Sequence, residues 1–140
     1  MRKITLPGIM WLLLTGLILT PSPLLSADAT VTVTKDQDGR EIALKVGTIL
    51  LIELPGQSGT GYSWMVEAAG APCLNLMDQT TLQLNEGRLG GPVRAGGPVM
   101  QVWRFKAEQS GACEIKMAYY RPWEGVGKAV DHFVVKLHIE

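Results

Sequence analysis

The sequence predicts an all-β fold in which two sheets pack as a sandwich. Three observations lead to this expectation. From Thr30 onward, apolar and polar residues alternate with a period of two, which is the pattern of half-buried strands. Gly and Pro residues separate the alternating segments, and no stretch shows the 3.6-residue apolar stripe of an amphipathic helix. Helix is therefore expected to be a minor component at most.

The first two expected strands come early in the chain. Val31 and Val33 alternate with threonines, which gives the first strand one apolar face. The second strand, Thr48–Leu54, is a nearly continuous apolar run of strand length. Gly47 precedes it, and the turn-forming pair Pro55-Gly56 is expected to end it.

Two segments in the middle of the chain differ in the clarity of their pattern. The segment Tyr62–Glu67 alternates regularly, and this alternation places Trp64 in the core. The segment Leu74–Leu84 is less regular, although Leu82 and Leu84 fit a strand at the edge of a sheet.

The C-terminal half contains three clear period-two segments: Gln101–Ala107, Cys113–Tyr119 and His132–Ile139. The first of them places Trp103 in the core. Together with the earlier segments they make about seven to eight short strands, which favours an immunoglobulin-like β-sandwich. Trp64 precedes both cysteines, so the Cys-Trp-Cys order of antibody domains is absent.

Residues 1–27 have the organisation of a secretory signal peptide. Arg2 and Lys3 form a positive start, an apolar run of 11 residues follows at 9–19, and prolines and small residues come next. This run is shorter than the roughly 20 residues that a helix needs to cross a bilayer. We therefore expect cleavage, a periplasmic or secreted location, no membrane attachment afterwards, and a mature domain of residues 28–140. An uncleaved membrane anchor is the alternative.

Cys73 and Cys113 are the only cysteines of the chain. In an exported protein they can form a disulfide, because this bond persists in oxidising compartments. The alternative is that both are small buried hydrophobic residues, as free cysteines often are. Two cysteines are too few for a disulfide-dense mini-protein or a four-cysteine zinc site.

Charge and residue content exclude several classes of function. The full chain carries 13 basic and 13 acidic residues, and residues 28–140 carry 11 and 13, whereas a nucleic-acid binder needs a basic excess. His132 and His138 are expected about 20 Å apart on one strand, so they cannot share a metal ion. The segment Gly56–Ser63 lacks the lysine of a phosphate-binding loop and the second glycine of a serine-hydrolase elbow. We therefore expect no catalytic activity, no metal and no cofactor.

Glycines and aromatic residues concentrate in three segments between expected strands: Gly56–Gly61, Glu86–Pro98 and Arg121–Gly125. In a sandwich, loops gather at the two ends, where rigid strands can hold a binding surface in place. Trp123 is the sharpest single candidate, because Trp is favoured at interface hot spots. The alternatives are turns that need a positive φ and, for Trp123, packing over the sandwich end against Tyr62.

The same three segments resemble the chagasin family of inhibitors of papain-like cysteine peptidases. That family carries an Asn-Pro-Thr-Thr-Gly-aromatic loop, a Gly-x-Gly-Gly loop and an Arg-Pro-Trp or Arg-Pro-Phe loop. Arg121-Pro122-Trp123 matches the third motif in full, and Ala95-Gly96-Gly97 matches the second except that an arginine replaces its first glycine. In the first motif Thr60-Gly61-Tyr62 matches, whereas Gln57-Ser58-Gly59 replaces Asn, Pro and the first Thr. The resemblance covers Thr30 to Glu140.

This resemblance implies a monomeric inhibitor that caps the peptidase cleft reversibly and non-covalently, without a cofactor. The residues that the resemblance assigns are Gly59, Thr60, Gly61 and Tyr62 in a central wedge near the catalytic cysteine, Val93, Ala95, Gly96 and Gly97 on one flank, and Arg121, Pro122 and Trp123 on the other. Gly59 cannot supply the hydroxyl or the methyl group of the family's threonine. An exported adhesion or assembly module, or a carbohydrate-binding module, is the alternative function.

Overall fold

The computed structural model describes residues 28–85, 88–89 and 96–140. The predicted signal peptide, residues 1–27, lies outside the described residues and stays a prediction. Within the described part, no helix is both long enough and apolar enough to cross a membrane.

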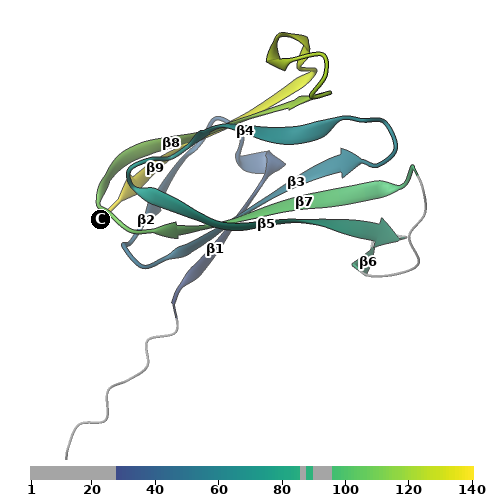
Figure 1. Cartoon of the computed structure of the whole chain (residues 1–140). Coiled ribbons are helices and arrows are strands. Elements are labelled where there is room, and N and C mark those ends of the chain that lie inside the picture. The colour runs from purple at the N-terminus through teal and green to yellow at the C-terminus, as the bar shows by residue number, and fades with distance from the viewer. Residues whose placement is uncertain (1–27, 86–87, 90–95) are drawn as a thin grey trace, which may run out of the picture.

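Two β-sheets face each other (Figure 1). One sheet has the strand order β1-β3-β7-β5-β6, and the other has the order β2-β9-β8-β4. The strands are β1 Thr30–Thr34, β2 Glu41–Leu44, β3 Ile49–Gln57, β4 Ser63–Ala69, β5 Leu74–Asn85, β6 Arg88–Leu89, β7 Pro98–Ala107, β8 Gly111–Tyr120 and β9 Asp131–Ile139. Two short 3₁₀ helices, η1 Lys35–Gln37 and η2 Val126–Lys128, are the other elements of the described residues. The all-β sandwich predicted from the sequence is therefore confirmed.

The chain begins in one sheet and crosses to the other. β1 pairs in parallel with β3, and after η1 the chain enters β2, which pairs in parallel with β9. The larger strands β3, β7 and β5, and likewise β4, β8 and β9, pair antiparallel. The N-terminal segment thus links the two sheets along one edge, while the long antiparallel strands carry the loops at the sandwich ends.

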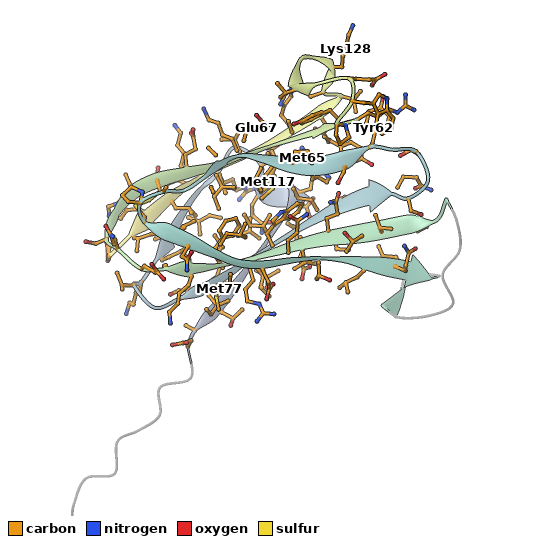
Figure 2. All side chains as sticks on the ribbon, viewed as in Figure 1. Tyr62, Met65, Glu67, Met77, Met117 and Lys128 are labelled. Carbon is orange, nitrogen blue, oxygen red and sulfur yellow. A yellow bond between two sulfur atoms is a disulfide. The ribbon has the colours of Figure 1, made fainter. Side chains whose placement is uncertain are left out.

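Alternate side chains of the two sheets fill the core. Trp64 and Trp103 are 2% and 0% exposed, which confirms the position that the alternation predicted for both. Met117 of β8 lies among the buried residues between the sheets (Figure 2). The other fully buried large side chains are Phe105, Phe133, Leu50, Ile52, Leu54, Ile115, Leu137, Ile139 and Val33. A core of this kind fixes the strand ends, and so fixes where the loops begin.

β3 is longer than the sequence predicts. The turn pair Pro55-Gly56 was expected to end this strand, but β3 continues to Gln57, with Pro55 opposite Met100 of β7. The pairing of β1 with β3 ends opposite Glu53. Beyond that point β3 is an edge strand within the described sheet, and proline is tolerated on edge strands.

Two other strands were less visible in the sequence. β2 has only four residues and was not predicted, because so short a segment shows no clear period. β5 covers the whole of the less regular segment Leu74–Leu84 and continues to Asn85, a length of 12 residues. Its register shifts between Leu76 and Asp78, and such a β-bulge reverses the alternation of faces partway along the strand.

Cys73 and Cys113 form a disulfide, which is the first of the two alternatives that the sequence left open. Cys73 is in the turn between β4 and β5, and Cys113 is in β8, so the bond joins the two sheets. Cys73 is 3% exposed and packs with the core. Cys73 follows the C-terminal end of β4, and Cys113 lies near the N-terminal end of β8. The disulfide is therefore at the sandwich end opposite the segments that follow β3 and β8.

Lys35 in η1 forms an ion cluster that fastens η1 to β9. Its Nζ lies 2.9 Å from a carboxylate oxygen of Asp38 and 2.9 Å from one of Asp131, and it also donates to the carbonyl of His132. The same Nζ lies 5.2 Å from the centre of the Trp64 ring. The cluster therefore holds η1 over the edge of the core.

We expect replacement of Asp38 by asparagine to lower Tm at pH 7 by a few degrees and to have no effect at pH 2. Partial burial alone would raise the pKa of Asp38, but hydrogen bonds from Lys35 and from two backbone amides outweigh it and lower the pKa below the ordinary value of 3.8. A lowered carboxyl pKa contributes stability above the ordinary value, and this contribution is lost as pH falls through the folded-state pKa. The cluster is partly exposed, so its contribution is about 1 kcal/mol or less.

Thermal melts of wild type and Asp38→Asn, followed by circular dichroism between pH 7 and pH 2, test this expectation. The two Tm curves should converge as the pH falls below about 4. A difference in Tm that stays constant across this range would show that the Asp38 charge contributes nothing to stability.

Candidate functional site

Hydrogen bonds join the described parts of three connections at one end of the sandwich. The wedge loop, Ser58–Tyr62, joins β3 to β4, and the C-terminal loop, Arg121–Val130, joins β8 to β9. The middle loop joins β6 to β7, and Gly96–Gly97 is its described part. Strands β3 and β8 run toward this end and β4 and β7 leave it, so the topology brings together three segments that are far apart in the sequence.

The wedge loop is hydrogen-bonded to the middle loop. Ser58 donates twice to the carbonyl oxygen of Gly97, from its backbone amide at 3.0 Å and from its hydroxyl at 2.9 Å. The side-chain amide of Gln57 donates to the carbonyl oxygen of Gly96. These bonds link residues 39 positions apart, so the two loops form one connected unit.

Gly59 is the closest point between these two loops. Its φ of +78° lies in the left-handed region that favours glycine. A Cβ atom at this position would lie 3.2 Å from the Cα of Gly96 and 3.3 Å from its backbone nitrogen. The substitution of glycine for the threonine of the family motif therefore has a local reason, because the close approach of the middle loop leaves little room for a side chain.

Thr60 at the tip of the wedge loop shapes its own backbone. Its hydroxyl donates to the carbonyl of Gln57 at 3.0 Å and accepts from the amide of Tyr62 at 3.3 Å. Gly59 and Thr60 are exposed. Because the hydroxyl is used within the loop, the surface offered at the tip is mainly main chain from Gly59 to Gly61.

Arg121 connects the C-terminal loop to the wedge loop. Its Nε donates to the carbonyl oxygen of Thr60 at 2.9 Å, and its guanidinium lies 4.6 Å from the centre of the Tyr62 ring. A longer contact of 3.8 Å joins its Nη1 to Glu124. The side chain of Arg121 is therefore engaged within the site, where it holds the wedge loop from the side opposite the middle loop.

Trp123 is the most exposed of the large apolar side chains in the described residues, at 72%. Pro122 beside it is also exposed, and a turn closed by the bond from the Glu124 amide to the Arg121 carbonyl, 2.9 Å, holds both. One edge of the indole lies against Gly61, where an added Cβ would be 2.2 Å from the Trp123 Cη2. The contact explains why Gly61 has no side chain, but it leaves most of the indole uncovered.

Tyr119 of β8 and Gln101 of β7 hold the bases of the three loops in place. The Tyr119 hydroxyl accepts from the Gln57 amide at 3.1 Å, and its ring lies 5.5 Å from the Tyr62 ring and 5.1 Å from the Trp64 ring, centre to centre. Gln101 is 5% exposed and joins the sheets, accepting from the Trp64 amide and donating to the Ser63 hydroxyl, both at 2.9 Å. These bonds fix the start of β4 and hence the exit of the wedge loop.

Sequence reasoning did not assign Gln101 or the side chain of Gln57 to the site. Gln101 had a usable signal, because it is a polar residue at an inward-facing position of a strand whose next inward residue is Trp103. Gln57 lies within the first glycine segment, at the position of the asparagine of the family's first motif, but that pattern does not show what its side chain bonds. Val93 and Ala95, which the resemblance placed on the middle loop, lie outside the described residues.

The edge of the site next to β4 carries a phenol and a carboxylate. Tyr120 donates its hydroxyl to Glu67 at 3.3 Å. Desolvation, and then the nearby negative charge of Glu67 and its hydrogen bond, raise the pKa of Tyr120. Among residues 28–85, 88–89 and 96–140 no group of three His, Cys, Asp or Glu side chains could hold a metal ion.

Comparison with known proteins gives one family. The model of the chagasin family peptidase inhibitor I42 matches residues 43–137. No curated protein sequence matches the chain.

Several solved structures share the fold. EhICP2, a cysteine protease inhibitor from Entamoeba histolytica, is 22% identical with a TM-score of 0.67, over 80% of this chain and 96% of that one. Amebosin is 23% identical with a TM-score of 0.61, over 81% and 100%. PbICP-C, solved in complex with falcipain-2, is 18% identical with a TM-score of 0.54, over 80% and 99%.

Proposed function

Because the chain belongs to the chagasin family of peptidase inhibitors, we propose that it blocks papain-like cysteine peptidases by filling the active-site cleft with its three loops. It is an inhibitor and not an enzyme. The observation that carries the cleft-filling proposal is that the wedge loop, Gly96–Gly97 of the middle loop and the C-terminal loop are joined by hydrogen bonds at one sandwich end. This surface is narrow at the tip, where glycines flank Thr60, and it presents Trp123 beside the tip.

The wedge loop is suited to enter a narrow cleft. Gly59 and Gly61 add no side-chain width, and the Thr60 hydroxyl is satisfied by the loop itself. The wedge therefore offers main-chain groups to an enzyme cleft, as an extended peptide substrate does. Inhibition is then steric and reversible, because the catalytic cysteine is covered without any covalent bond to the inhibitor.

The wedge is already held in shape before the peptidase arrives. Gln57 and Ser58 fix one side of it, Arg121 fixes the other, and Tyr62 supports it from between Arg121 and Tyr119. Binding a preorganised surface avoids the entropic cost of ordering loops, which otherwise reduces affinity. We assign Arg121 and Tyr62 to holding the wedge, and Thr60, Gly61 and Trp123 to contacting the enzyme.

We also propose that the chain is exported, with residues 1–27 removed as a signal peptide and residues 28–140 acting in the periplasm or outside the cell. The composition of residues 1–27 and the Cys73–Cys113 disulfide support this location, since disulfides persist in oxidising compartments. Expression in a bacterium, fractionation and N-terminal sequencing test it. A recovered protein that still begins at Met1 would contradict the proposal.

Titration of papain or of a cathepsin L-type peptidase with a fluorogenic peptide tests the function. We expect inhibition with a sub-micromolar constant, reversal on dilution, and no cleavage of the inhibitor. A folded sample that leaves the peptidase fully active at about 10 μM, a concentration corresponding to roughly 7 kcal/mol of binding free energy, would overturn the proposal.

Replacement of Trp123 by alanine is expected to weaken inhibition by at least about 1 kcal/mol, roughly fivefold, because an exposed indole beside the wedge is an anchor for the enzyme surface. The inhibition constants of the two proteins measure this effect. Tm should stay within about 2 °C, since truncation of an exposed side chain changes stability little. An unchanged inhibition constant would show that Trp123 only covers Gly61.

A further inference from the structure

The exposed apolar side chains of the described residues concentrate in one loop. Three of them belong to the C-terminal loop: Trp123 at 72%, Val126 at 48% and Val130 at 62% exposed. The others are Val46 in the turn between β2 and β3, and Leu76 with Met77 at the bulge of β5. Within residues 28–85, 88–89 and 96–140, the C-terminal loop is the part of the proposed inhibitory surface that carries such residues.

Val126 and Val130 lie on ordered backbone. The 3₁₀ helix η2 begins at Val126, and bonds from Lys128 to Gly125 at 3.1 Å and from Ala129 to Val126 at 3.0 Å close it. The amide of Val130 donates to the carbonyl of Tyr119 at 2.9 Å, which ties the end of the loop to β8. The two valines are therefore held in place with much of their apolar surface in water.

One side of η2 faces open space. A Cβ atom added at Gly125 or at Gly127 would meet no atom within 4 Å, so the space beside these two glycines is empty in the described structure. Figure 2 shows Lys128, the last residue of η2, pointing away from the strands at the outer end of the loop. What distinguishes these two valines from other exposed apolar residues is that they lie on the same ordered loop as Trp123, so a protein that binds Trp123 can also reach them.

We propose that Val126 and Val130 form an accessory contact surface for the peptidase, on the enzyme surface outside the cleft. This inference rests on the proposed function. The C-terminal loop is fixed at one end by Arg121 on the wedge loop and at the other by Val130 on β8. A partner that receives Trp123 therefore meets η2 three residues further along the same loop.

The size of the surface favours the peptidase over a second copy of this chain. A stable interface buries about 800 Å² on each partner, and two partly exposed valines supply only a small fraction of that area. They can add to an interface that the three loops already make, but they cannot hold two copies together by themselves. The peptidase region that they contact must be apolar and must lie beside the cleft on the side that receives Trp123.

The double variant Val126→Ser/Val130→Ser tests the inference in the full-length inhibitor. We expect the inhibition constant against papain to rise about fivefold to tenfold, mainly through faster dissociation, because about two half-buried valine side chains lose apolar contact. Val46→Ser is the matched control, since Val46 is 49% exposed but lies in the turn between β2 and β3. That control should inhibit within about twofold of wild type.

Each outcome separates the inference from the function on which it rests. If wild type inhibits and the double variant inhibits equally well, the accessory contact surface is wrong and the proposed function stands. Wild type that does not inhibit overturns both. Sedimentation of the free proteins adds a second readout: a wild type that dimerises and a double variant that does not would show that a second copy occupies these valines. Unchanged thermal melts exclude misfolding, because both side chains are exposed.

Discussion

Replacement of Gly61 by alanine should raise the inhibition constant about 100-fold or more while the sandwich still folds. The φ of +81° at Gly61 costs an alanine about 1–2 kcal/mol. The new Cβ would also lie 2.2 Å from Cη2 and 3.0 Å from Cζ2 of Trp123. A rigid indole cannot bend away, so the whole ring or the wedge loop has to move. Both the tip and its neighbouring anchor then leave the geometry that a cleft would recognise.

Gly39→Ala is the control that separates backbone strain from the collision. Gly39 has a similar φ of +75°, but an added Cβ there would meet no atom within 4 Å. It lies in the turn between η1 and β2, outside the three loops. We expect this variant to lose some thermal stability and to inhibit within about twofold of wild type. Equal inhibition by Gly61→Ala and Gly39→Ala would show that the contact between Gly61 and Trp123 plays no part in the function.

The double variant Gly61→Ala/Trp123→Ala distinguishes the two consequences of the collision. Removal of the indole relieves the overlap, so the double variant should be more stable than Gly61→Ala alone. Its inhibition should not exceed that of Trp123→Ala, because the anchor is gone. This non-additivity is the expected sign of two residues in direct contact.

Much of the fold follows from local sequence patterns. Strict alternation around Trp64 and Trp103 identifies two inward faces, because successive side chains of a strand point to opposite sides. The concentration of glycines between strands identifies the three loops. β5 was harder to predict, since its bulge at Leu76–Asp78 shifts the register and removes the simple period.

The connections within the site could not be predicted in the same way. Ser58 and Gly97 are 39 residues apart, and their hydrogen bonds exist only because β3 and β7 are neighbours in one sheet. A polar side chain in a glycine-rich loop has the same local pattern whether it faces water or another loop. The resemblance located the motifs, but the role of Gln57 and the close approach at Gly59 depend on tertiary contacts.

Gly59 departs from the family motif at the closest point between the wedge loop and the middle loop. Comparison with the family pattern identifies a missing threonine and suggests a weaker wedge. A side chain at Gly59 would press on the backbone of Gly96, so glycine at this position lets the wedge loop and the middle loop lie close together. The wedge loop lacks that hydroxyl and methyl group, but the hydrogen bonds from Ser58 to Gly97 hold it against the middle loop, which lowers the ordering cost of binding.

Removal of the disulfide should have the largest effect on stability and little effect on inhibition at 25 °C. Cys73 and Cys113 are separated by 40 residues, and opening a loop of this size increases the entropy of the unfolded chain by the equivalent of about 4 kcal/mol. For a domain of this size the loss corresponds to a fall in Tm of roughly 20 °C. Denaturation of wild type and of Cys73→Ala/Cys113→Ala measures the change in the free energy of unfolding and the change in Tm. Alanine is preferred to serine because Cys73 is 3% exposed, and a buried hydroxyl would add a cost of its own.

The position of the disulfide separates stability from function. The bond joins the sheets at the sandwich end away from the wedge, middle and C-terminal loops, whose geometry depends on Gln101, Tyr119 and Arg121 instead. The double variant should therefore inhibit within about threefold of wild type at a temperature where it is folded. Wild type in a reducing buffer provides the matched comparison, because peptidase assays include a thiol to keep the catalytic cysteine as the reactive thiolate. If the reduced or substituted protein stays folded but no longer inhibits, the two sheets transmit strain to the loops and the rigid-scaffold account is wrong.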